Sequence, residues 1–356
     1  MRVIVGMSGG VDSSLAAFLL QREGHEVIGA TMRIAEGGAD AVAGARAVAE
    51  TLGIPHCVVD LREAFRRRIV DTFAAAYSAG RTPNPCVQCN AEIKFGLLWE
   101  ALADWGADCM ATGHYVRREY LPDVHRYTLR RPRDHSKDQT YVLYRLSQGQ
   151  LARARFPLGT WTKGEVRTLA GELDLPAAET SESQEICFVP GDYRDFLAAR
   201  DPGILCPGPI VDGGGRVLGE HRGLAFYTVG QRRGLGIAAG EPLYVLRLRP
   251  LDNAVVVGPK SALYAAGARV VNLSWMIPLE EGKVHDAQVR IRYNAPAVPA
   301  TLYPRGDDID VHFDEFQPAV TPGQSAVFYR RDRLLGGGFI NAAHFIGAEC
   351  GCGGAN

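Results

Sequence analysis

Residues 3–13 read VIVGMSGGVDS, an apolar run that ends in a serine and two glycines before an amphipathic stretch begins. The pattern predicts a strand, a tight turn and then a helix over residues 11–23, with Gly24 placed to end it. Glycines in such a turn let the backbone bring bare N–H groups to an anion, and the helix dipole points its positive end at the same spot. The stretch therefore predicts a phosphate site at the end of a strand.

The loop lacks the Gly-Lys-Ser/Thr ending of a Walker A loop. It resembles instead the SGGxDS pyrophosphate loop of the ATP pyrophosphatases, which cut ATP between the α and β phosphates and adenylate a substrate. A glycine-rich turn with no ligand is the alternative. The resemblance implies that Asp12 is a ligand or ligand-orienting group for Mg²⁺, and that the phosphates of ATP are held by Gly6, Met7, Ser8, Gly9, Gly10, Val11, Asp12 and Ser13.

The composition is that of an ordinary globular protein with two or three domains: 356 residues, 46% hydrophobic and 22% charged. No apolar run approaches membrane-spanning length, and the chain enters a strand at once, so we expect no signal peptide and a cytoplasmic location. A net charge of −1 does not by itself indicate a nucleic-acid partner. Arginine clusters such as residues 66–68 and 130–133 fit either a polyanion site or solvated surface.

The first half of the chain alternates strands with helices, which predicts an α/β fold with an open, Rossmann-like parallel sheet of the adenine nucleotide α-hydrolase type. Ligands of such sheets bind beyond the carboxyl ends of the strands. Those ends are Met7, Met32 and Gly113-His114 here. Strands are expected at residues 3–7, 27–33, 56–60 and 109–112, and helices at residues 11–23, 39–52, 62–78, 91–105 and 163–173.

The second half of the chain reads as strands. Turn signals at residues 212–215 and 252–253 predict hairpins, and alternating apolar runs follow them. We therefore expect a small β-rich domain and then a C-terminal β-barrel. The expected domains are residues 1–198 for ATP chemistry, 199–268 for the β-rich unit and 269–348 for the barrel, with a tail over 349–356.

Eight cysteines in a cytosolic chain do not indicate a disulfide framework. Three of them follow apolar patterns that predict burial, and two lie in the tail. The remaining ones are Cys86, Cys89 and Cys187. We expect Cys89 just before a helix that starts near residue 91, where the dipole and Lys94 favour the thiolate. Half a zinc site is the alternative for Cys86 and Cys89, and a core thiol is the alternative for Cys187. Burial is expected for Cys57, Cys109 and Cys206, and the tail holds Cys350 and Cys352.

Taken together, several motifs give the chain a specific resemblance. It resembles the bacterial tRNA-specific 2-thiouridylase family over nearly its whole length. This implies an enzyme that converts the wobble uridine of tRNA to 2-thiouridine with ATP and a persulfide sulfur, releasing AMP and pyrophosphate. Its partners would be tRNA, at the anticodon stem-loop, and a sulfur donor such as a cysteine desulfurase. The motifs are GMSGGVDS at 6–13, TPNP at 82–85 with CN at 89–90, ATGHY at 111–115, KDQ at 137–139, ICF at 186–188 and YTVGQRRGL at 227–235.

The resemblance also implies roles for single residues. Cys187 would carry the persulfide and Cys89 would be its partner thiol, while Met32 and Gly113 would contact the adenosine. Asn84, Pro85 and Cys86 would border the target base. For Tyr293 a place in the barrel core is an equal alternative to an RNA contact. The positions that match tRNA contacts of the family are His114, Lys137, Asp138, Gln139, Arg292, Tyr293 and Gln324.

One position departs from the family pattern, because many members carry Asp where this chain has Cys86. A thiol is a weaker base than a carboxylate, so the identity of the base stays open. Three cysteines also permit a [4Fe-4S] cluster on Cys86, Cys89 and Cys187, which we favour less than the persulfide route. Two competing interpretations of the chain are a pyrophosphate-loop ligase for tRNA-lysidine or amide synthesis, and a nucleotide-binding regulatory module without turnover.

Overall fold

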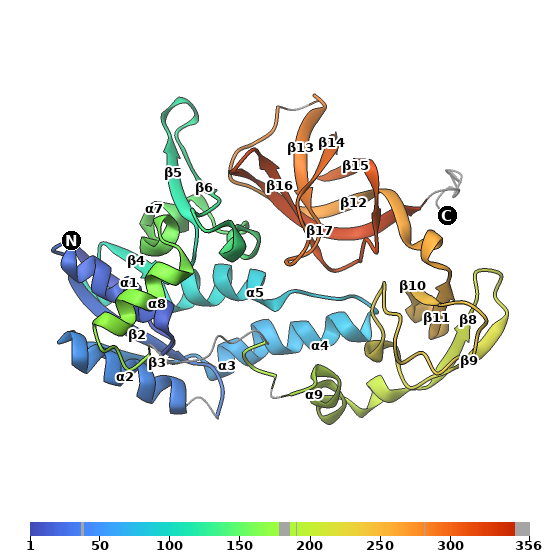
Figure 1. Ribbon diagram of the computed structural model, residues 1–356, viewed down its shortest axis with the longest axis horizontal. Helices are drawn as coiled ribbons and strands as arrows, with labels where there is room; N and C mark the ends of the chain where they lie inside the picture. Colours follow the sequence, from blue (N-terminus) through green and yellow to red (C-terminus); the bar gives the residue numbers. More distant parts are fainter. Residues whose placement is uncertain (37–38, 178–185, 190, 281, 346–356) are drawn as a thin grey trace.

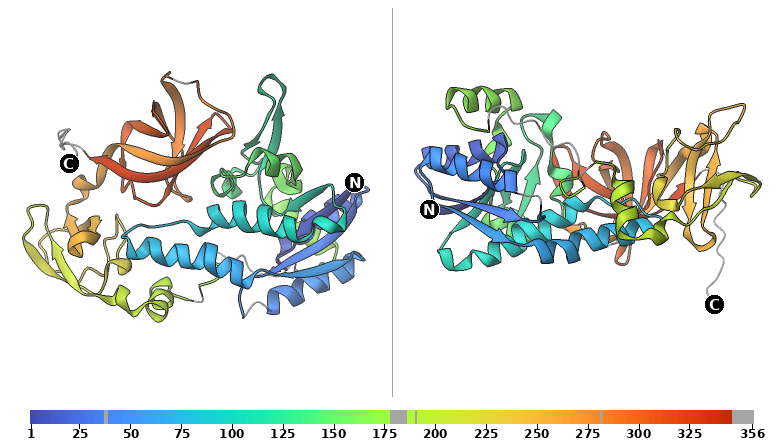
Figure 2. Two further views of the ribbon diagram at one scale, coloured as in Figure 1. Left: turned by 180° about the vertical axis from the view of Figure 1, so that it is seen from behind. Right: turned by 90° about the horizontal axis from the view of Figure 1, so that it is seen from below.

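The computed structural model describes residues 1–356 except 37–38, 178–185, 190, 281 and 346–356. An α/β unit, a β-rich unit and a β-barrel follow one another along the chain (Figure 1). The helical segments over residues 62–78 and 85–105 extend from the α/β unit towards the β-rich unit, as Figure 2 also shows. Among the described residues, no helix is long and apolar enough to cross a membrane. The predicted tail over 349–356, with Cys350 and Cys352, lies outside the described residues.

The α/β unit is built on a parallel sheet of order β3-β2-β1-β4-β7. The predicted strands are confirmed, and β7 is an addition too short for a sequence pattern to reveal. The central strand is fully buried on both faces at Val3, Ile4 and Val5. The register aligns Gly6 with Ala30 and Thr112, so the carboxyl ends meet at one edge. The bounds are β1 Arg2–Gly6, β2 Glu26–Arg33, β3 His56–Asp60, β4 Cys109–Thr112 and β7 Ala154–Arg155.

Helices α1 (Val11–Arg22), α2 (Ala39–Leu52) and α8 (Lys163–Glu172) flank the sheet, close to their predicted bounds. The helix predicted over 62–78 is continuous but has a π-helical middle. It consists of α3 Arg62–Phe65, η1 Arg66–Val70 and α4 Asp71–Ser78.

The prediction for the helix over 91–105 is wrong at its start, because the helix begins at Pro85. A proline fits the first helical position, where no N–H is needed. The Asn84 side chain accepts a hydrogen bond from the Cys86 N–H at 3.1 Å and caps the helix. The helix consists of α5 Pro85–Gln88, the π-helical η2 Cys89–Leu98, α6 Trp99–Ala101 and the 3₁₀ turn η3 Ala103–Trp105.

A β-hairpin, β5–β6, and short helical pieces follow the sheet. Strand β6 meets the barrel where Arg130 pairs with Arg333. Capping boxes at Ser147 and Thr162 begin α7 and α8. The elements are β5 Arg117–Leu121, η4 Pro122–Val124, β6 Arg126–Arg130, η5 His135–Lys137, η6 Thr140–Val142, α7 Gln148–Arg153, η7 Pro157–Thr160 and α9 Tyr193–Arg200.

The β-rich unit is a sheet of order β10-β11-β8-β9, and both predicted turns lie in it. Asn253 takes the left-handed conformation, with φ of 46°, in the turn before β11. The predicted burial of Cys206 is wrong, since this thiol is exposed, whereas Cys109 is buried and Cys57 half-buried. The elements are η8 Pro202–Leu205, β8 Gly208–Val211, β9 Val217–His221, η9 Leu224–Phe226, β10 Tyr244–Arg249, η10 Pro250–Asp252 and β11 Ala254–Gly258.

The predicted C-terminal barrel is confirmed. Antiparallel strands run in the order β12-β15-β14-β13-β16-β17, and β12 also pairs with β17, which closes the sheet. Alternate side chains such as Val270, Leu302 and Phe328 fill the interior and are fully buried. The elements are η11 Lys260–Leu263, β12 Tyr264–Trp275, β13 His285–Arg290, β14 Val298–Arg305, β15 Asp308–Pro318, β16 Ser325–Arg330 and β17 Arg333–Phe345.

Candidate active site

A pocket of roughly 190 Å³ lies at the carboxyl ends of β1, β2 and β4, where the parallel sheet predicts a ligand. Gly9, Gly10 and Val11, which were also predicted to hold ATP, are not among the residues that line it. Lys94, His114 and Gln139 add polar groups to its wall. The lining residues that were predicted to hold ATP are Gly6, Met7, Ser8, Asp12, Ser13, Met32 and Gly113.

Two glycines are required by the geometry of this pocket. Gly9 has φ of 76°, and a Cβ there would lie 2.9 Å from the carbonyl oxygen of Ala41. A Cβ at Gly113 would lie 2.6 Å from the carbonyl carbon of Asp12 and 2.7 Å from the nitrogen of Ser13. The backbone directly after β4 therefore lies so close to the start of α1 that no side chain fits at position 113 without a shift.

Serine hydroxyls hold the loop in its turn. Ser13 Oγ accepts a hydrogen bond from the Ser8 N–H at 3.2 Å and donates one to the Gly10 carbonyl at 3.0 Å. Gly10 is the N-cap of α1 and provides no side-chain cap. The first-turn N–H groups have no partner within a helix, so an anion can accept from them here. The loop is therefore shaped for phosphate before any ligand arrives.

Asp12, in the first turn of α1, is held by a buried lysine. Lys163 Nζ donates to both carboxylate oxygens, at 2.7 and 2.8 Å, and the Tyr115 hydroxyl donates to Oδ1 at 2.7 Å. The Lys163 side chain is only 9% exposed. Both carboxylate oxygens of Asp12 therefore have partners within the protein, and a role of Asp12 toward Mg²⁺ stays a prediction. Sequence reasoning missed Lys163, which is 151 positions away and is found only through the packing of α8 on α1.

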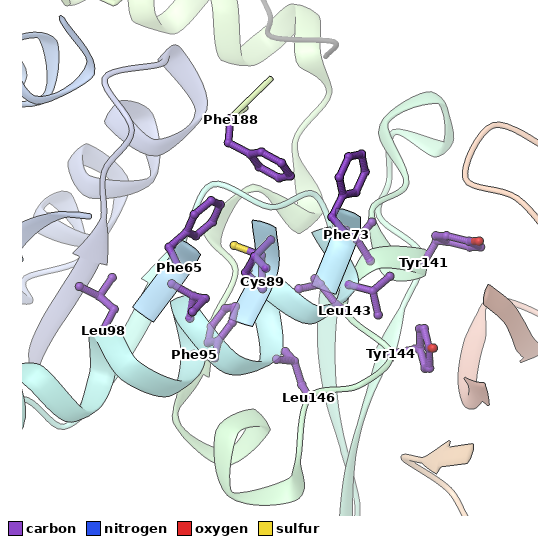
Figure 3. Close-up of a cluster of buried hydrophobic side chains, with 14 of the residues drawn as sticks. Phe65, Phe73, Cys89, Phe95, Leu98, Tyr141, Leu143, Tyr144, Leu146 and Phe188 are labelled. Carbon is purple, nitrogen blue, oxygen red and sulfur yellow. The ribbon is translucent and has the colours of Figure 1, made fainter. Parts of the chain in front are cut away.

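The thiols of Cys86 and Cys89 lie one helical turn apart in different surroundings. Cys86 is exposed in α5, whereas Cys89 is only 7% exposed and lies among Phe65, Phe73 and Phe188 (Figure 3). The Phe188 ring makes edge contacts with Phe65 and Phe73, at centroid distances of 5.5 and 5.4 Å. Phe188 therefore anchors its exposed neighbour, Cys187, to the core that covers Cys89.

Burial determines the protonation of these thiols. Burial raises the pKa of Cys89 to about 12, against a lowering by the Lys94 ammonium and further raising by Cys187 and Cys86. The dense protein surroundings also raise the pKa of Cys86 and of Cys187, and Lys94 again opposes the shift. The predicted thiolate at Cys89 is wrong for this conformation. Since the helix begins at Pro85, Cys89 lies beyond the first turn and inside the core.

A metal or cluster does not fit the thiols as they are arranged. Among the described residues, no group of three or more His, Cys, Asp or Glu side chains could hold a metal ion. Cys89 faces an aromatic core while Cys86 faces solvent. Cys86, Cys89 and Cys187 are all free thiols. Among the described residues, this arrangement supports neither of the two alternatives, half a zinc site or a [4Fe-4S] cluster.

His114 and Gln139 lie in the wall of this pocket at the strand ends. His114 Nδ1 shares a hydrogen bond of 2.8 Å with the Thr112 hydroxyl, and burial holds the pKa of the imidazole well below its usual range. The ring is therefore neutral. Gln139 accepts a hydrogen bond from the Tyr115 N–H at 2.8 Å. A tRNA contact for either residue stays a prediction, and it would occur beside the nucleotide.

Asp138 and Arg292 are committed to contacts within the protein. The buried Asp138 carboxylate accepts from the Thr140 hydroxyl at 2.6 Å and from Arg290 at 3.2 Å. Arg292 donates to the Ala319 carbonyl and to the Thr321 hydroxyl. Asp138 thus joins the α/β unit to the barrel. RNA contacts of both residues stay predictions, and so does that of Lys137, which is half-buried at the end of η5.

The barrel reaches the segment that leads to Cys86. Gln324 Nε2 donates to the Thr82 carbonyl at 2.8 Å, and the Thr82 N–H donates to the Pro322 carbonyl at 3.1 Å. Asn84 and Pro85 follow directly as the cap and first residue of α5. Hydrogen bonds therefore join the barrel to the segment that leads into the helix of Cys86 and Cys89.

Tyr293 is half-buried and packs against the core of the α/β unit rather than in the barrel interior. Its ring lies 5.9 Å from that of Tyr141, and the Arg290 guanidinium lies 5.5 Å from its centre. Burial raises the pKa of Tyr293, and the Arg290 guanidinium opposes the rise. The ring therefore lies outside the barrel interior, so the barrel-core alternative is not supported, and an RNA contact of Tyr293 stays a prediction.

The fold and the loop define the class, an α/β protein whose N-terminal unit carries a pyrophosphate loop on a parallel sheet. A family model described as the tRNA methyl transferase HUP domain matches residues 1–191. The tRNA methyl transferase PRC-barrel domain matches residues 194–259, and the Aminomethyltransferase beta-barrel domain matches residues 266–340.

Relatives cover nearly the whole chain. The tRNA-specific 2-thiouridylase MnmA of Pelotomaculum thermopropionicum is 48% identical over 96% of this chain and 97% of its own length. That of Carboxydothermus hydrogenoformans is 48% identical over 95% and 97%, and that of Moorella thermoacetica is 47% identical over 95% and 99%. The chain belongs to the tRNA-specific 2-thiouridylase family.

Proposed function

We propose that this chain is a tRNA 2-thiouridylase, which adenylates the C2 oxygen of the wobble uridine and then replaces that oxygen with sulfur. The observation that carries the proposal is that Lys94 lies between the nucleotide pocket and the three thiols. This residue lines the nucleotide pocket and acts electrostatically on all three thiols, Cys86, Cys89 and Cys187. A family membership shown by near-complete relatives supports the same activity.

In the first step, ATP binds with its β and γ phosphates on residues 8–13, accompanied by Mg²⁺. Met32 and Gly113 border the adenosine, since both line the pocket. The uridine O2 forms a bond to the α-phosphorus, the bond to the β-phosphate oxygen breaks, and pyrophosphate leaves with the electron pair. C2 becomes electrophilic because AMP is a better leaving group than oxide.

In the second step, Cys187 carries a persulfide received from a sulfur donor such as a cysteine desulfurase. Its outer sulfur attacks C2, and the C2–O bond breaks to release AMP. The Cys89 thiolate then attacks the inner sulfur of Cys187, which leaves 2-thiouridine and a Cys89–Cys187 disulfide that a cellular thiol reductant reopens. Because Cys89 is covered by Phe188 in this conformation, the Cys187 segment must shift before that attack.

The tRNA would enter from the side where the barrel meets the thiol helix, with the wobble base taken out of its stack because C2 is otherwise inaccessible. Asn84, Pro85 and Cys86 would border the base, and Tyr293 offers a ring for stacking. The ranges 1–198, 199–268 and 269–348 are proposed as the catalytic, central and tRNA-contacting domains. Because its proposed substrate is tRNA, a cytoplasmic location is part of this proposal.

The decisive experiment is mass spectrometry of tRNA nucleosides after incubation of the protein with tRNA, ATP and a persulfide donor. We expect 2-thiouridine, with AMP and pyrophosphate released in equal amounts. Labelled sulfur that never enters RNA, with lysidine or an amide formed instead, would favour another pyrophosphate-loop ligase. No tRNA-dependent pyrophosphate release would favour a regulatory module. Iron and sulfide in anaerobically purified protein would revive the [4Fe-4S] cluster.

A further inference from the structure

Lys94 occupies an unusual position between two parts of the site. It follows Cys89 by five residues on η2, and its half-buried side chain lines the nucleotide pocket together with Ser8, Asp12 and His114. Within the described part of the chain, it is the only lysine or arginine that lines this pocket. An anion bound there therefore meets one formal positive charge.

No carboxylate in the described ranges forms an ion pair with Lys94. Lys163, in contrast, forms an ion pair with Asp12, in which Nζ lies 2.7 Å from Oδ1. The neighbouring His114 imidazole is neutral, because burial and Lys94 itself hold its pKa well below the usual range. Among the described residues, the Lys94 ammonium is thus the unneutralised cation of the pocket, and an incoming phosphate is the partner that its surroundings lack.

Lys94 also acts on the sulfur side. Its charge opposes the rise in the pKa of Cys86, of Cys89 and of Cys187, so it is within electrostatic reach of all three thiols. Within the described residues, it is the one cation that lowers the pKa of Cys86 and of Cys89. The Lys94 side chain is therefore close to both the nucleotide pocket and the thiols of the sulfur transfer.

We propose that Lys94 is a catalytic residue that contacts the α-phosphoryl group of ATP and serves both steps of the reaction. This inference rests on the proposed function. In the adenylation, O2 bonds to the α-phosphorus while pyrophosphate leaves with its electron pair, and Lys94 offsets the charge that grows on the α-phosphoryl oxygens. In the sulfur transfer, the C2–O bond breaks and AMP leaves with the electron pair on its oxygen. Lys94 stays protonated and neutralises that charge beside the approaching persulfide.

The test compares Lys94→Met with Lys94→Arg, which keeps the charge. The control is Lys260→Met, because Lys260 is an exposed lysine at the start of η11, remote in sequence from the site. Three quantities are measured: ATP affinity by calorimetry, tRNA-dependent pyrophosphate release, and alkylation of Cys86 and Cys187 by iodoacetamide followed on peptides. Thermal unfolding verifies that each variant is folded.

We expect Lys94→Met to slow pyrophosphate release about 100-fold, the cost typical of losing one charge-stabilising group, with a much smaller loss of ATP affinity. Alkylation of Cys86 and Cys187 should slow about threefold as the thiolate fraction falls. Lys94→Arg should recover part of both. A folded Lys94→Met that matches Lys260→Met in both rates overturns the inference. Failure of the unchanged protein to form 2-thiouridine refutes the proposed function instead, while the alkylation comparison still decides the role of Lys94 toward the thiols.

Discussion

The nucleotide loop and the thiol cluster of this site differ in how ready they are to react. Residues 8–13 are held in a phosphate-binding turn by Ser13, by the close approach of Gly113 and by the pairing of Asp12 with Lys163. Cys89, in contrast, is buried beneath Phe188 with its pKa raised to about 12. Buried thiols with raised pKa values are poor nucleophiles.

The difference indicates an order of events. In the proposed mechanism, the preformed loop would bind ATP at once, whereas the sulfur chemistry would require a rearrangement that uncovers Cys89. In the proposed mechanism, this arrangement would keep a reactive thiolate from forming before the uridine has been activated. Because Phe188 adjoins Cys187, a single movement of this segment would release Cys89 and carry Cys187 with it.

The largest effect should come from removing either thiol. Cys89→Ser and Cys187→Ser should each lower 2-thiouridine formation by at least about 1,000-fold, since serine neither carries a persulfide nor resolves one. ATP binding and tRNA-dependent pyrophosphate release should remain, because the loop is independent of both thiols. Cys187→Ser should also lose protein-bound sulfur after incubation with a cysteine desulfurase.

Cys206→Ser is the matched control, since Cys206 is an exposed thiol of the β-rich unit. It should thiolate tRNA like the unchanged protein. Normal 2-thiouridine in Cys89→Ser would make Cys86 the candidate resolving thiol and would remove Cys89 from the mechanism.

The next largest effect should come from crowding the loop. In Gly113→Ala the new methyl group would lie 2.6 Å from the carbonyl carbon of Asp12, so the backbone must shift. We expect ATP affinity to fall at least about tenfold, as a displaced loop misplaces its N–H groups. Gly171→Ala, where nothing lies within 4 Å of the added Cβ, should bind ATP normally. Equal affinities for the two variants would show that the loop is not preformed.

Sequence reasoning was most successful where a short pattern determines local structure. The loop, the strand ends at Met7 and Met32, and the hairpin at residues 212–215 could all be predicted from such patterns. It failed at Pro85, because the helix that was expected to start near residue 91 begins there, with Asn84 as its cap. That displacement puts Cys89 inside the core rather than at a helix end.

Features that depend on tertiary packing have no local pattern. Lys163 reaches Asp12 only because α8 packs on α1. Tyr293 contacts the α/β unit only because the barrel packs against that unit. The burial of Cys89 is set by Phe65 and Phe188, which are far from it in sequence. The charge of a site can thus be foreseen from sequence better than the burial that determines its pKa values.

A smaller effect should follow from uncovering Cys89 deliberately. Phe188→Ala removes the ring that contacts Phe65 and Phe73, so Cys89 should become accessible. We expect its alkylation by iodoacetamide to become about tenfold faster, since reactivity follows thiolate fraction and exposure. Phe316→Ala, at a phenylalanine that is 55% exposed on β15, should leave the rate unchanged. An equally slow reaction in both variants would mean that further side chains protect Cys89.

The smallest effect concerns stability at alkaline pH. The thiol of Cys89 ionises near its ordinary pKa of 9.0 in the unfolded chain, whereas burial raises its pKa to about 12 in the folded protein. Between these values the folded state binds more protons, so this contribution is fully present below 9 and is lost as pH rises towards 12. The loss is at most about 1.4 kcal/mol per pH unit. Urea denaturation under reducing conditions, at about pH 8 and about pH 10.5, should show a fall in unfolding free energy that is about 2 kcal/mol smaller in Cys89→Ser than in Cys206→Ser. Identical falls in the two variants would mean that Cys89 is already ionised or exposed in the folded protein, and the contrast between a ready loop and a covered thiol would be lost.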